Sequence, residues 1–91
     1  MSFKFEKLKV WNTALELSDE IDKTALSFPK HELFSLTSQI KRAADSVVLN
    51  IAEGSTLQTD TEFRRFLVIA NRSAIEVVAC LYISKRRNYI D

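Results

Sequence analysis

The only proline, Pro29, and the only glycine, Gly54, bracket one uninterrupted helical pattern. Within it, apolar residues recur at steps of three and four and form a single stripe: Leu33, Leu36, Ile40, Ala43, Val47 and Ile51. That spacing is typical of a helix packed between partners in a bundle, and it predicts a helix over about 30–53. Pro29 is tolerated at the first turn of such a helix, and we expect Gly54 to form a left-handed C-terminal cap.

Two further helices are predicted on either side. Residues 7–27 carry one apolar row and a second, flanking row: Val10, Ala14, Leu17, Ile21, Thr24 and Phe28, with Leu8, Trp11 and Leu15. After the polar stretch 54–60, Thr59 and Glu62 have the spacing of a capping box, which predicts a third helix over about 60–87. Its expected buried side is Phe63, Phe66, Leu67, Ala70, Ala74, Val77 and Leu81. Short connections between long helices predict an all-α, up-down antiparallel bundle.

Length and composition agree with one small domain, residues 1–91, and exclude several classes of protein. A single cysteine, Cys80, excludes an internal disulfide and fits a reducing compartment, so we expect a cytoplasmic protein. The N-terminus has no apolar core of a signal peptide. No apolar run approaches the roughly 20 residues that span a bilayer, so we expect no membrane partner.

The residues that could support catalysis are isolated. His31 has no second histidine or cysteine to form a metal site, and Cys80 lies among apolar residues, where it is expected to be a small buried hydrophobe. One glycine leaves no Gly-rich loop for phosphates. We therefore expect no enzyme, no metal, no cofactor and no small-molecule substrate.

Nucleic-acid binding has a better basis, because the basic residues are unevenly distributed. The chain has a net charge of only +1, but residues 59–91 carry six basic and four acidic side chains. Arg65, Arg72 and Arg86 are separated by multiples of seven and are predicted to lie on one helix face. The remaining candidates for phosphate contacts are Lys85, Arg87, Lys41 and Arg42. The alternative is a solvated face with salt bridges.

The N-terminal aromatic residues have two readings as well. Phe3, Phe5 and Trp11 could stack on bases. Aromatic residues at helical spacing more often belong to the core or to a subunit interface, and we favour that reading.

Four runs of residues carry a family resemblance: Phe5-Glu6-x-Leu8-x-Val10-Trp11-x-x-Ala14; Phe28-Pro29-x-x-Glu32-x-Phe34-x-Leu36-x-x-Gln39-Ile40-x-Arg42-Ala43-Ala44-x-Ser46, continued by Asn50-Ile51-Ala52-Glu53-Gly54; Glu62-Phe63-x-x-Phe66-Leu67-x-Ile69-Ala70; and Asn88-Tyr89-Ile90. Together they resemble the bacterial four-helix-bundle family of proteins encoded in intervening sequences of 23S rRNA genes, sometimes labelled a ribosomal protein. The resemblance covers nearly the whole chain.

The resemblance implies an up-down four-helix bundle that assembles as a ring, a pentamer in known relatives. A related accessory protein of diversity-generating retroelements is a basic ring that binds nucleic acid and a reverse transcriptase. No enzymatic activity is attached to the family. The resemblance thus implies a homo-oligomer whose other partners are RNA or a nucleic-acid–protein complex.

Two departures from the family pattern affect this reading. Arg72 stands where relatives usually have a glycine, so its side chain must point outward or alter a close helix contact. Relatives continue into a fourth helix, whereas this sequence stops at Asp91, so the fourth helix is absent or truncated. Three helices of a four-helix plan would expose an apolar surface that another subunit has to cover.

The leading functional hypothesis is therefore a non-catalytic oligomeric protein that binds RNA through a basic face. The alternative is a protein–protein scaffold with no nucleic-acid role, which the near-neutral net charge favours.

Overall fold

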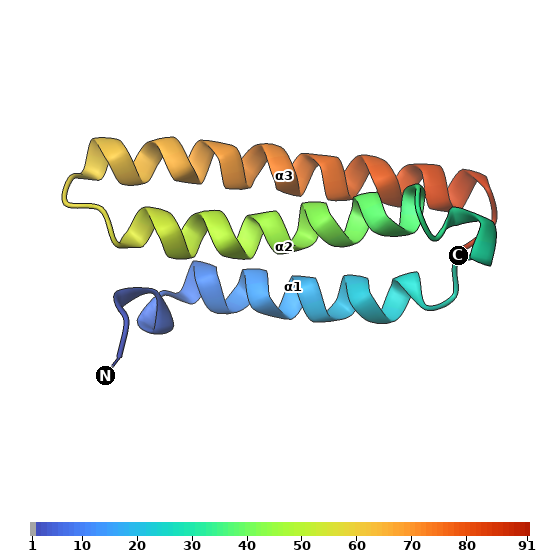
Figure 1. Ribbon diagram of the computed structural model, residues 1–91, viewed down its shortest axis with the longest axis horizontal. Coiled ribbons are helices and arrows are strands. Elements are labelled where there is room, and N and C mark those ends of the chain that lie inside the picture. Colours follow the sequence, from blue (N-terminus) through green and yellow to red (C-terminus); the bar gives the residue numbers. More distant parts are fainter. Residues whose placement is uncertain (1) are drawn as a thin grey trace.

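The computed structural model describes residues 2–91 and contains three long helices, as the apolar periodicity predicts. They are α1 (Lys9–Ala25), α2 (Leu36–Ser55) and α3 (Asp60–Arg86), and each runs antiparallel to the next (Figure 1). Two short 3-10 helices, η1 (Lys4–Lys7) and η2 (Lys30–Glu32), precede α1 and α2. No strand occurs within residues 2–91, and the bundle measures 44 × 25 × 21 Å. The predicted all-α class and the three helices are confirmed.

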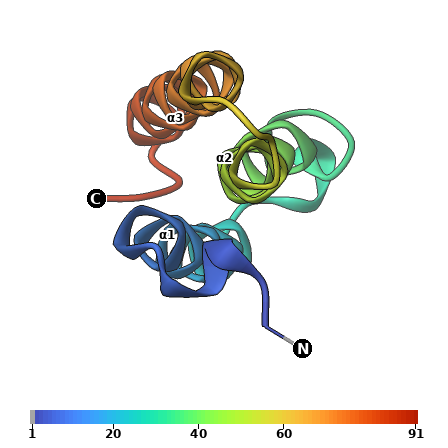
Figure 2. The same cartoon turned by 90° about the vertical axis from the view of Figure 1, so that its left-hand side faces the viewer.

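Helix α2 is the centre of the bundle, and α1 and α3 pack on two of its sides (Figure 2). No Cα atom of α1 lies within 8 Å of a Cα atom of α3. Side chains of these two helices pack on shared core clusters: Leu17 of α1 and Leu81 of α3 pack on one, and Trp11 and Leu67 pack on the other. The last residues of the chain curl into the space between α1 and α3 (Figure 2).

The predicted stripe of α2 supplies most of the core. Ile40 is completely buried, and Leu36, Ala43, Val47 and Ile51 are buried with it. On α3, Ala70, Val77 and Cys80 complete the core from the opposite side, and burial raises the pKa of the Cys80 thiol, with a smaller effect from Glu76. The prediction that Cys80 is a small buried hydrophobe is confirmed.

The prediction of one unbroken helix over 30–53 is wrong. The segment starts as the 3-10 helix η2, turns at residues 33–35, and becomes α-helical only at Leu36. Ser35 has φ −126° and ψ −98°, which no helix contains. Leu33, the first residue of the predicted stripe, is half exposed as a result. Just before this turn, the Glu32 side chain is buried and its carboxylate has several partners. The first helix is also shorter than predicted, Lys9–Ala25 rather than 7–27.

The predicted left-handed cap at Gly54 is also wrong. Gly54 has a negative φ, and α2 continues through it to Ser55. Its role is close approach, because a Cβ atom built at Gly54 would lie 2.6 Å from the Cβ of Phe66 and 2.9 Å from the ring of Phe63. The glycine therefore allows α2 and α3 to meet tightly beside the loop that joins them.

The left-handed residue is Asn88, with φ 62°. Beyond the end of α3, the N–H of Tyr89 donates to the carbonyl of Ser84 at 2.9 Å, and the N–H of Asn88 donates to the carbonyl of Lys85 at 3.0 Å. These two bonds form a Schellman motif, and asparagine tolerates the left-handed position better than most residues. At the other end of α3, Thr59 accepts a hydrogen bond from the N–H of Glu62 at 3.1 Å, so the threonine half of the predicted capping box is confirmed.

Helix α3 is the least covered of the three. An 18-residue window within it has a mean hydropathy of 1.7, so by length and composition α3 could cross a membrane, contrary to the expectation that no segment could. Core helices of soluble proteins meet the same criterion, but only 17% of this window is buried. The exposed large apolar side chains of α3 are Val68, Ile69, Ile75, Val78, Tyr82 and Ile83. This surface is left without cover by the rest of residues 2–91.

Candidate nucleic-acid interface

Three of the predicted phosphate-binding residues form a row along the outside of α3. Arg65, Arg72 and Arg86 are all exposed, and a spacing of seven residues shifts a side chain by only about 20° around a helix. None of the three forms an ion pair with another side chain of residues 2–91. The exposure of Arg72 agrees with the first of the two alternatives stated for it, a side chain that points outward.

A polar furrow separates this row from α2. A hollow between the two helices is lined by Gln39, Arg42, Ala43, Ser46, Ser73 and Glu76. The Ser73 hydroxyl donates to that of Ser46 at 2.9 Å, and the Gln39 amide donates to Glu76 at 3.4 Å. Arg72 lies one helical turn from Glu76, and Arg42 lies one turn from Gln39, so arginines flank both walls. We call Arg42, Arg65, Arg72 and Arg86 the arginine face.

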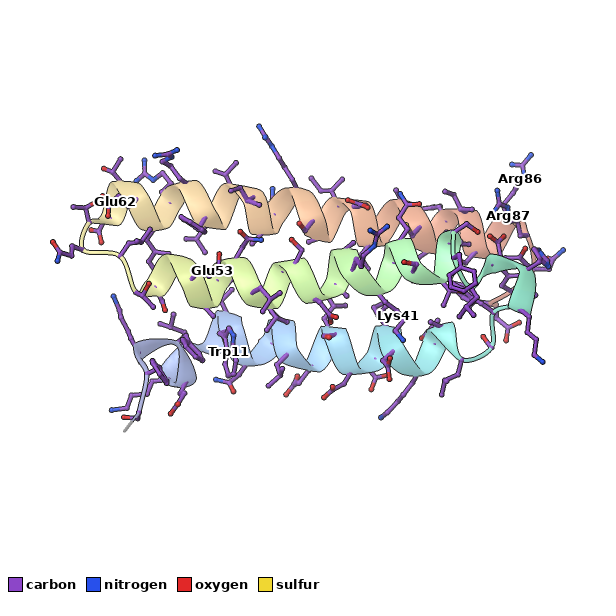
Figure 3. The ribbon with its side chains drawn as sticks, viewed as in Figure 1. Trp11, Lys41, Glu53, Glu62, Arg86 and Arg87 are labelled. Atoms are coloured by element: carbon purple, nitrogen blue, oxygen red, sulfur yellow. The ribbon has the colours of Figure 1, made fainter. Side chains whose placement is uncertain are left out.

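Lys41 and Arg42 do not act as a pair, although they are adjacent in sequence. The Lys41 ammonium lies 3.2 Å from the carboxylate of Asp22, on the side of α2 that faces α1 (Figure 3). Arg42 has no ion-pair partner in residues 2–91; its Nε donates to the carbonyl of Ser38 at 3.4 Å, and its side chain lines the furrow. Arg42 therefore joins the furrow, and Lys41 does not.

The Lys85-Arg86-Arg87 cluster is divided in the same way. Arg86 projects outward from the end of α3, whereas Arg87 turns back toward η2 (Figure 3). The Arg87 Nη1 lies 2.8 Å from a carboxylate oxygen of Glu32, so Arg87 already has an anionic partner within the fold. Lys85 is exposed and lies on the side of α3 that carries Val78 and Leu81. Only Arg86 of this cluster continues the arginine row.

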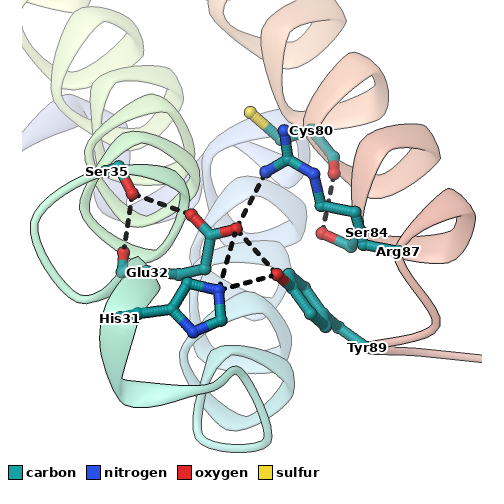
Figure 4. A network of polar contacts seen from close by, with 7 residues as sticks. All are labelled: His31, Glu32, Ser35, Cys80, Ser84, Arg87 and Tyr89. Carbon is teal, nitrogen blue, oxygen red and sulfur yellow. Dashed lines mark hydrogen bonds and ion pairs between the residues drawn. The ribbon is translucent and has the colours of Figure 1, made fainter.

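Glu32 forms the centre of a polar network that the sequence analysis did not anticipate (Figure 4). Its side chain is buried, and its carboxylate accepts hydrogen bonds from the Ser35 hydroxyl at 2.7 Å, the Arg87 guanidinium at 2.8 Å and the Tyr89 hydroxyl at 2.8 Å. His31 lies 3.2 Å from the Tyr89 hydroxyl. The network joins η2 to the residues after α3.

These hydrogen bonds hold the pKa of Glu32 at about 2, well below its ordinary value of 4.5. The largest contribution is the Ser35 hydroxyl, followed by the Tyr89 hydroxyl, while the positive charge of Arg87 adds a smaller effect. The same bond to Glu32 raises the pKa of Tyr89. Both Glu32 and Tyr89 occur in the runs that carry the family resemblance, and that was the available signal. Their pairing across 57 residues was not visible in the sequence.

The N-terminal aromatic residues stack on one another. The rings of Phe3 and Phe5 are 5.4 Å apart and nearly parallel, and Phe5 lies 4.8 Å from Trp11. The Lys4 ammonium lies 5.7 Å from the centre of the Phe63 ring at the start of α3. Since these rings contact one another, this geometry favours packing over base stacking.

The described residues offer no centre for metal chemistry. No group of three or more histidine, cysteine, aspartate or glutamate side chains within residues 2–91 is arranged to hold a metal ion. The acidic side chains Asp22 and Asp45 between α1 and α2 already contact Lys41 and Ser18, the latter at 2.6 Å.

One known protein family matches the sequence of this bundle. The family model of the 23S rRNA-intervening sequence protein matches residues 6–91, which include all three helices and the Glu32 network. The chain belongs to this family. No curated protein matches the chain. Membership in the 23S rRNA-intervening sequence family accounts for the helical plan, and the family description states no activity, so the arginine face is the basis for a functional proposal.

Proposed function

We propose that this 23S rRNA-intervening sequence protein is a non-catalytic, self-associating helical protein that binds RNA through its arginine face. The observation that carries the proposal is the row of Arg65, Arg72 and Arg86, three exposed guanidinium groups without ion-pair partners in residues 2–91. A charged side chain that is not neutralised within the fold is free to bind an external anion.

The arginine face suits a phosphate backbone better than a base sequence. Arginine forms bidentate hydrogen bonds with phosphate oxygens, and such contacts position a nucleic acid without reading its bases. Within the furrow, the Ser46 and Ser73 hydroxyls are bonded to one another. Glu76 is the one acidic side chain of the furrow, and it opposes an approaching phosphate.

The uncovered surface of α3 supports the proposed self-association. Monomeric proteins rarely leave so many large apolar side chains exposed along one helix. The family resemblance implies a ring of identical subunits, with RNA or a nucleic-acid–protein complex as the further partner. We place the protein in the cytoplasm, where a free cysteine such as Cys80 stays reduced.

A protein–protein scaffold is the second candidate function, and one observation favours it. Phe34 is 94% exposed, and Leu26 and Leu33 are exposed beside it at the connection between α1 and α2. This apolar patch borders Arg42 but includes no residue of α3, so it offers a protein partner a surface other than the α3 row.

The test compares two triple charge reversals in an RNA filter-binding assay at low and high salt. The variant Arg65→Glu/Arg72→Glu/Arg86→Glu removes the row, and Lys7→Glu/Lys9→Glu/Lys23→Glu makes the same charge change near α1. We expect the arginine variant to lose RNA retention and the lysine variant to keep most of it. Equal losses of RNA retention in the two variants would mean that only the net charge of the protein matters. If both variants retain RNA as the unmodified chain does, RNA does not bind through the arginine face. Partner binding that is independent of salt would support the scaffold, because phosphate binding weakens steeply as salt rises.

A further inference from the structure

Two polar contacts cross the furrow from α2 to α3, with Ala43 between them along α2. One joins the Ser46 and Ser73 hydroxyls at 2.9 Å. The other joins the Gln39 amide to the Glu76 carboxylate at 3.4 Å. Because Ala43 contributes only a methyl group, a hollow of about 320 Å³ remains between the two helices. That volume is within the range of small-ligand sites.

Glu76 is unexpected in a surface that binds only phosphates, because its carboxylate repels them. The side chain is exposed, and its one hydrogen bond, at 3.4 Å from Oε2 to the Gln39 amide, is longer than the usual distance of about 2.9 Å. Oε1 has no hydrogen-bond partner among residues 2–91, and Glu76 forms no ion pair there. Both carboxylate oxygens are therefore available to accept hydrogen bonds from a ligand.

Gln39 and Glu76 together present a donor beside two acceptors. The Gln39 amide nitrogen carries two hydrogens, so it keeps a second N–H for a ligand while it stays next to Oε2 of Glu76. The order from Gln39 outward is one donor and then two carboxylate oxygens. The Watson–Crick edge of guanine has the complementary order, because O6 accepts and N1–H and the N2 amino group donate.

The other bases satisfy fewer of these groups. Adenine and cytosine each have one amino group beside a ring nitrogen that accepts, so each forms two hydrogen bonds with the same pair of side chains. Uracil has one N–H between two carbonyl groups, and its second carbonyl would face a carboxylate oxygen. Guanine forms three hydrogen bonds, and two of them go to an ionised carboxylate, which makes them stronger than neutral ones.

The base has to be unpaired to bind in this way. In an RNA duplex the Watson–Crick edge is occupied by the opposite strand, whereas in loops and single strands it is free for protein side chains. Arg42 lines the same furrow without an ion-pair partner in residues 2–91, and its guanidinium plane is a surface on which an unpaired base can stack. Arg72, one helical turn from Glu76, is within reach of a neighbouring phosphate.

We infer that the furrow binds an unpaired guanine of the RNA, which donates N1–H and N2–H to Glu76 and accepts at O6 from Gln39. The inference rests on the RNA binding in the proposed function and names the base that this site selects. Contacts with phosphates position a nucleic acid, and contacts with base edges select its sequence. The arginine row holds the strand, and the furrow sets the preference for guanine.

The first experiment measures the binding of the full chain to short labelled oligouridines by fluorescence anisotropy. Each oligonucleotide has one central position changed to guanosine, adenosine, cytidine or inosine. We expect guanosine to bind about tenfold more tightly than adenosine or cytidine, a ratio typical of a good multidentate base contact. Inosine lacks the N2 amino group and should lie between them. A guanosine paired within a hairpin stem should have no advantage over a paired adenosine.

Three variants locate the preference in the furrow. Glu76→Gln should bind every oligonucleotide at least as tightly, because it no longer repels phosphate, but should lose the preference for guanosine. Glu16→Gln removes the same charge from α1 and should keep that preference. Gln39→Ala should reduce the preference several-fold through the lost contact with O6. Circular dichroism shows whether each variant remains helical.

The ratio of affinities and their absolute values answer different questions. Equal binding of all oligonucleotides, abolished by reversal of the arginine row, would overturn the guanine site and leave the proposed RNA binding in place. A preference for guanosine that survives Glu76→Gln would also overturn the site, because another surface would then select the base. No binding of any oligonucleotide at low salt would overturn both the guanine site and the proposed RNA binding.

Discussion

The Glu32 carboxylate accepts a hydrogen bond from the Arg87 guanidinium at 2.8 Å, which ties the turn before α2 to the end of α3. The two residues are 55 positions apart. Tyr89 and Ser35 donate to the same carboxylate, and the Schellman motif at Asn88 brings Tyr89 within reach. The segment before α2 and the residues after α3 are therefore held together by a single buried acidic side chain.

This network predicts a specific loss of stability in acid. The folded-state pKa of Glu32, about 2, lies below its ordinary value of 4.5, so the carboxylate stabilises the fold fully above pH 4.5. That contribution is lost as the pH falls from 4.5 toward 2, because the unfolded chain binds the proton first. Thermal unfolding followed by circular dichroism at steps between pH 7 and pH 2.5 measures the effect. Glu32→Gln should flatten the dependence, whereas the exposed Glu16→Gln should leave it unchanged. Identical curves for Glu32→Gln and the unmodified chain would contradict the network.

Gly54→Ala should destabilise the protein, although the same change stabilises most helices. Alanine is favoured over glycine inside a helix by about 1 kcal/mol. Here the new methyl group would lie 2.6 Å from the Cβ of Phe66, which forces α2 and α3 apart. We expect a net loss of about 1–3 kcal/mol in the free energy of unfolding, measured in urea. Glu53→Ala, one residue away and exposed, should change it by less than about 0.5 kcal/mol. A Gly54→Ala variant more stable than the unmodified chain would show that α2 and α3 have room for a methyl group between Gly54 and Phe66.

Ile40→Ala should be among the most destabilising substitutions in the chain. Ile40 is completely buried at the centre of α2, so its truncation leaves a cavity between both neighbouring helices. The expected loss is about 2–5 kcal/mol in the free energy of unfolding. Leu49→Ala removes a similar volume from an exposed position on the same helix and serves as the control. Equal losses at the two positions would mean that another molecule covers Leu49.

Arg42→Gln and Lys41→Gln should differ in their effect on RNA binding. Arg42 flanks the furrow without an ion-pair partner in residues 2–91, whereas Lys41 is held 3.2 Å from Asp22. If Arg42 contacts one phosphate, its loss should reduce the slope of log affinity against log salt by roughly 0.7–0.9. Lys41→Gln should leave the slope nearly unchanged. Titrations at four salt concentrations measure both slopes. A larger change of slope for Lys41→Gln than for Arg42→Gln would indicate that RNA binds on the side of α2 that faces α1.

Features set by neighbouring residues were predictable. The apolar spacing of α2 gave the correct buried stripe from Leu36 to Ile51, and the Thr59 cap fixed the start of α3 at Asp60. The arginine row was predictable for the same reason, since a seven-residue spacing keeps side chains on one face of any helix. Which basic side chains are free was not predictable, because Lys41 and Arg87 are neutralised by Asp22 and Glu32, residues of other elements.

The sequence by itself determined that there are three helices and which face of α2 is buried, because periodicity and capping act over three or four residues. The tertiary structure decided the rest. The turn at Ser35 interrupts a segment with full helical periodicity because Glu32 gains three hydrogen bonds by pointing inward, one of them from its neighbour Ser35 and two from Arg87 and Tyr89 at the far end of the chain. Gly54 does not cap α2 as predicted; it lies within the helix, where the absence of a side chain allows the close approach of Phe66. Such choices depend on distances between segments remote in sequence, and those distances are fixed only when the helices pack.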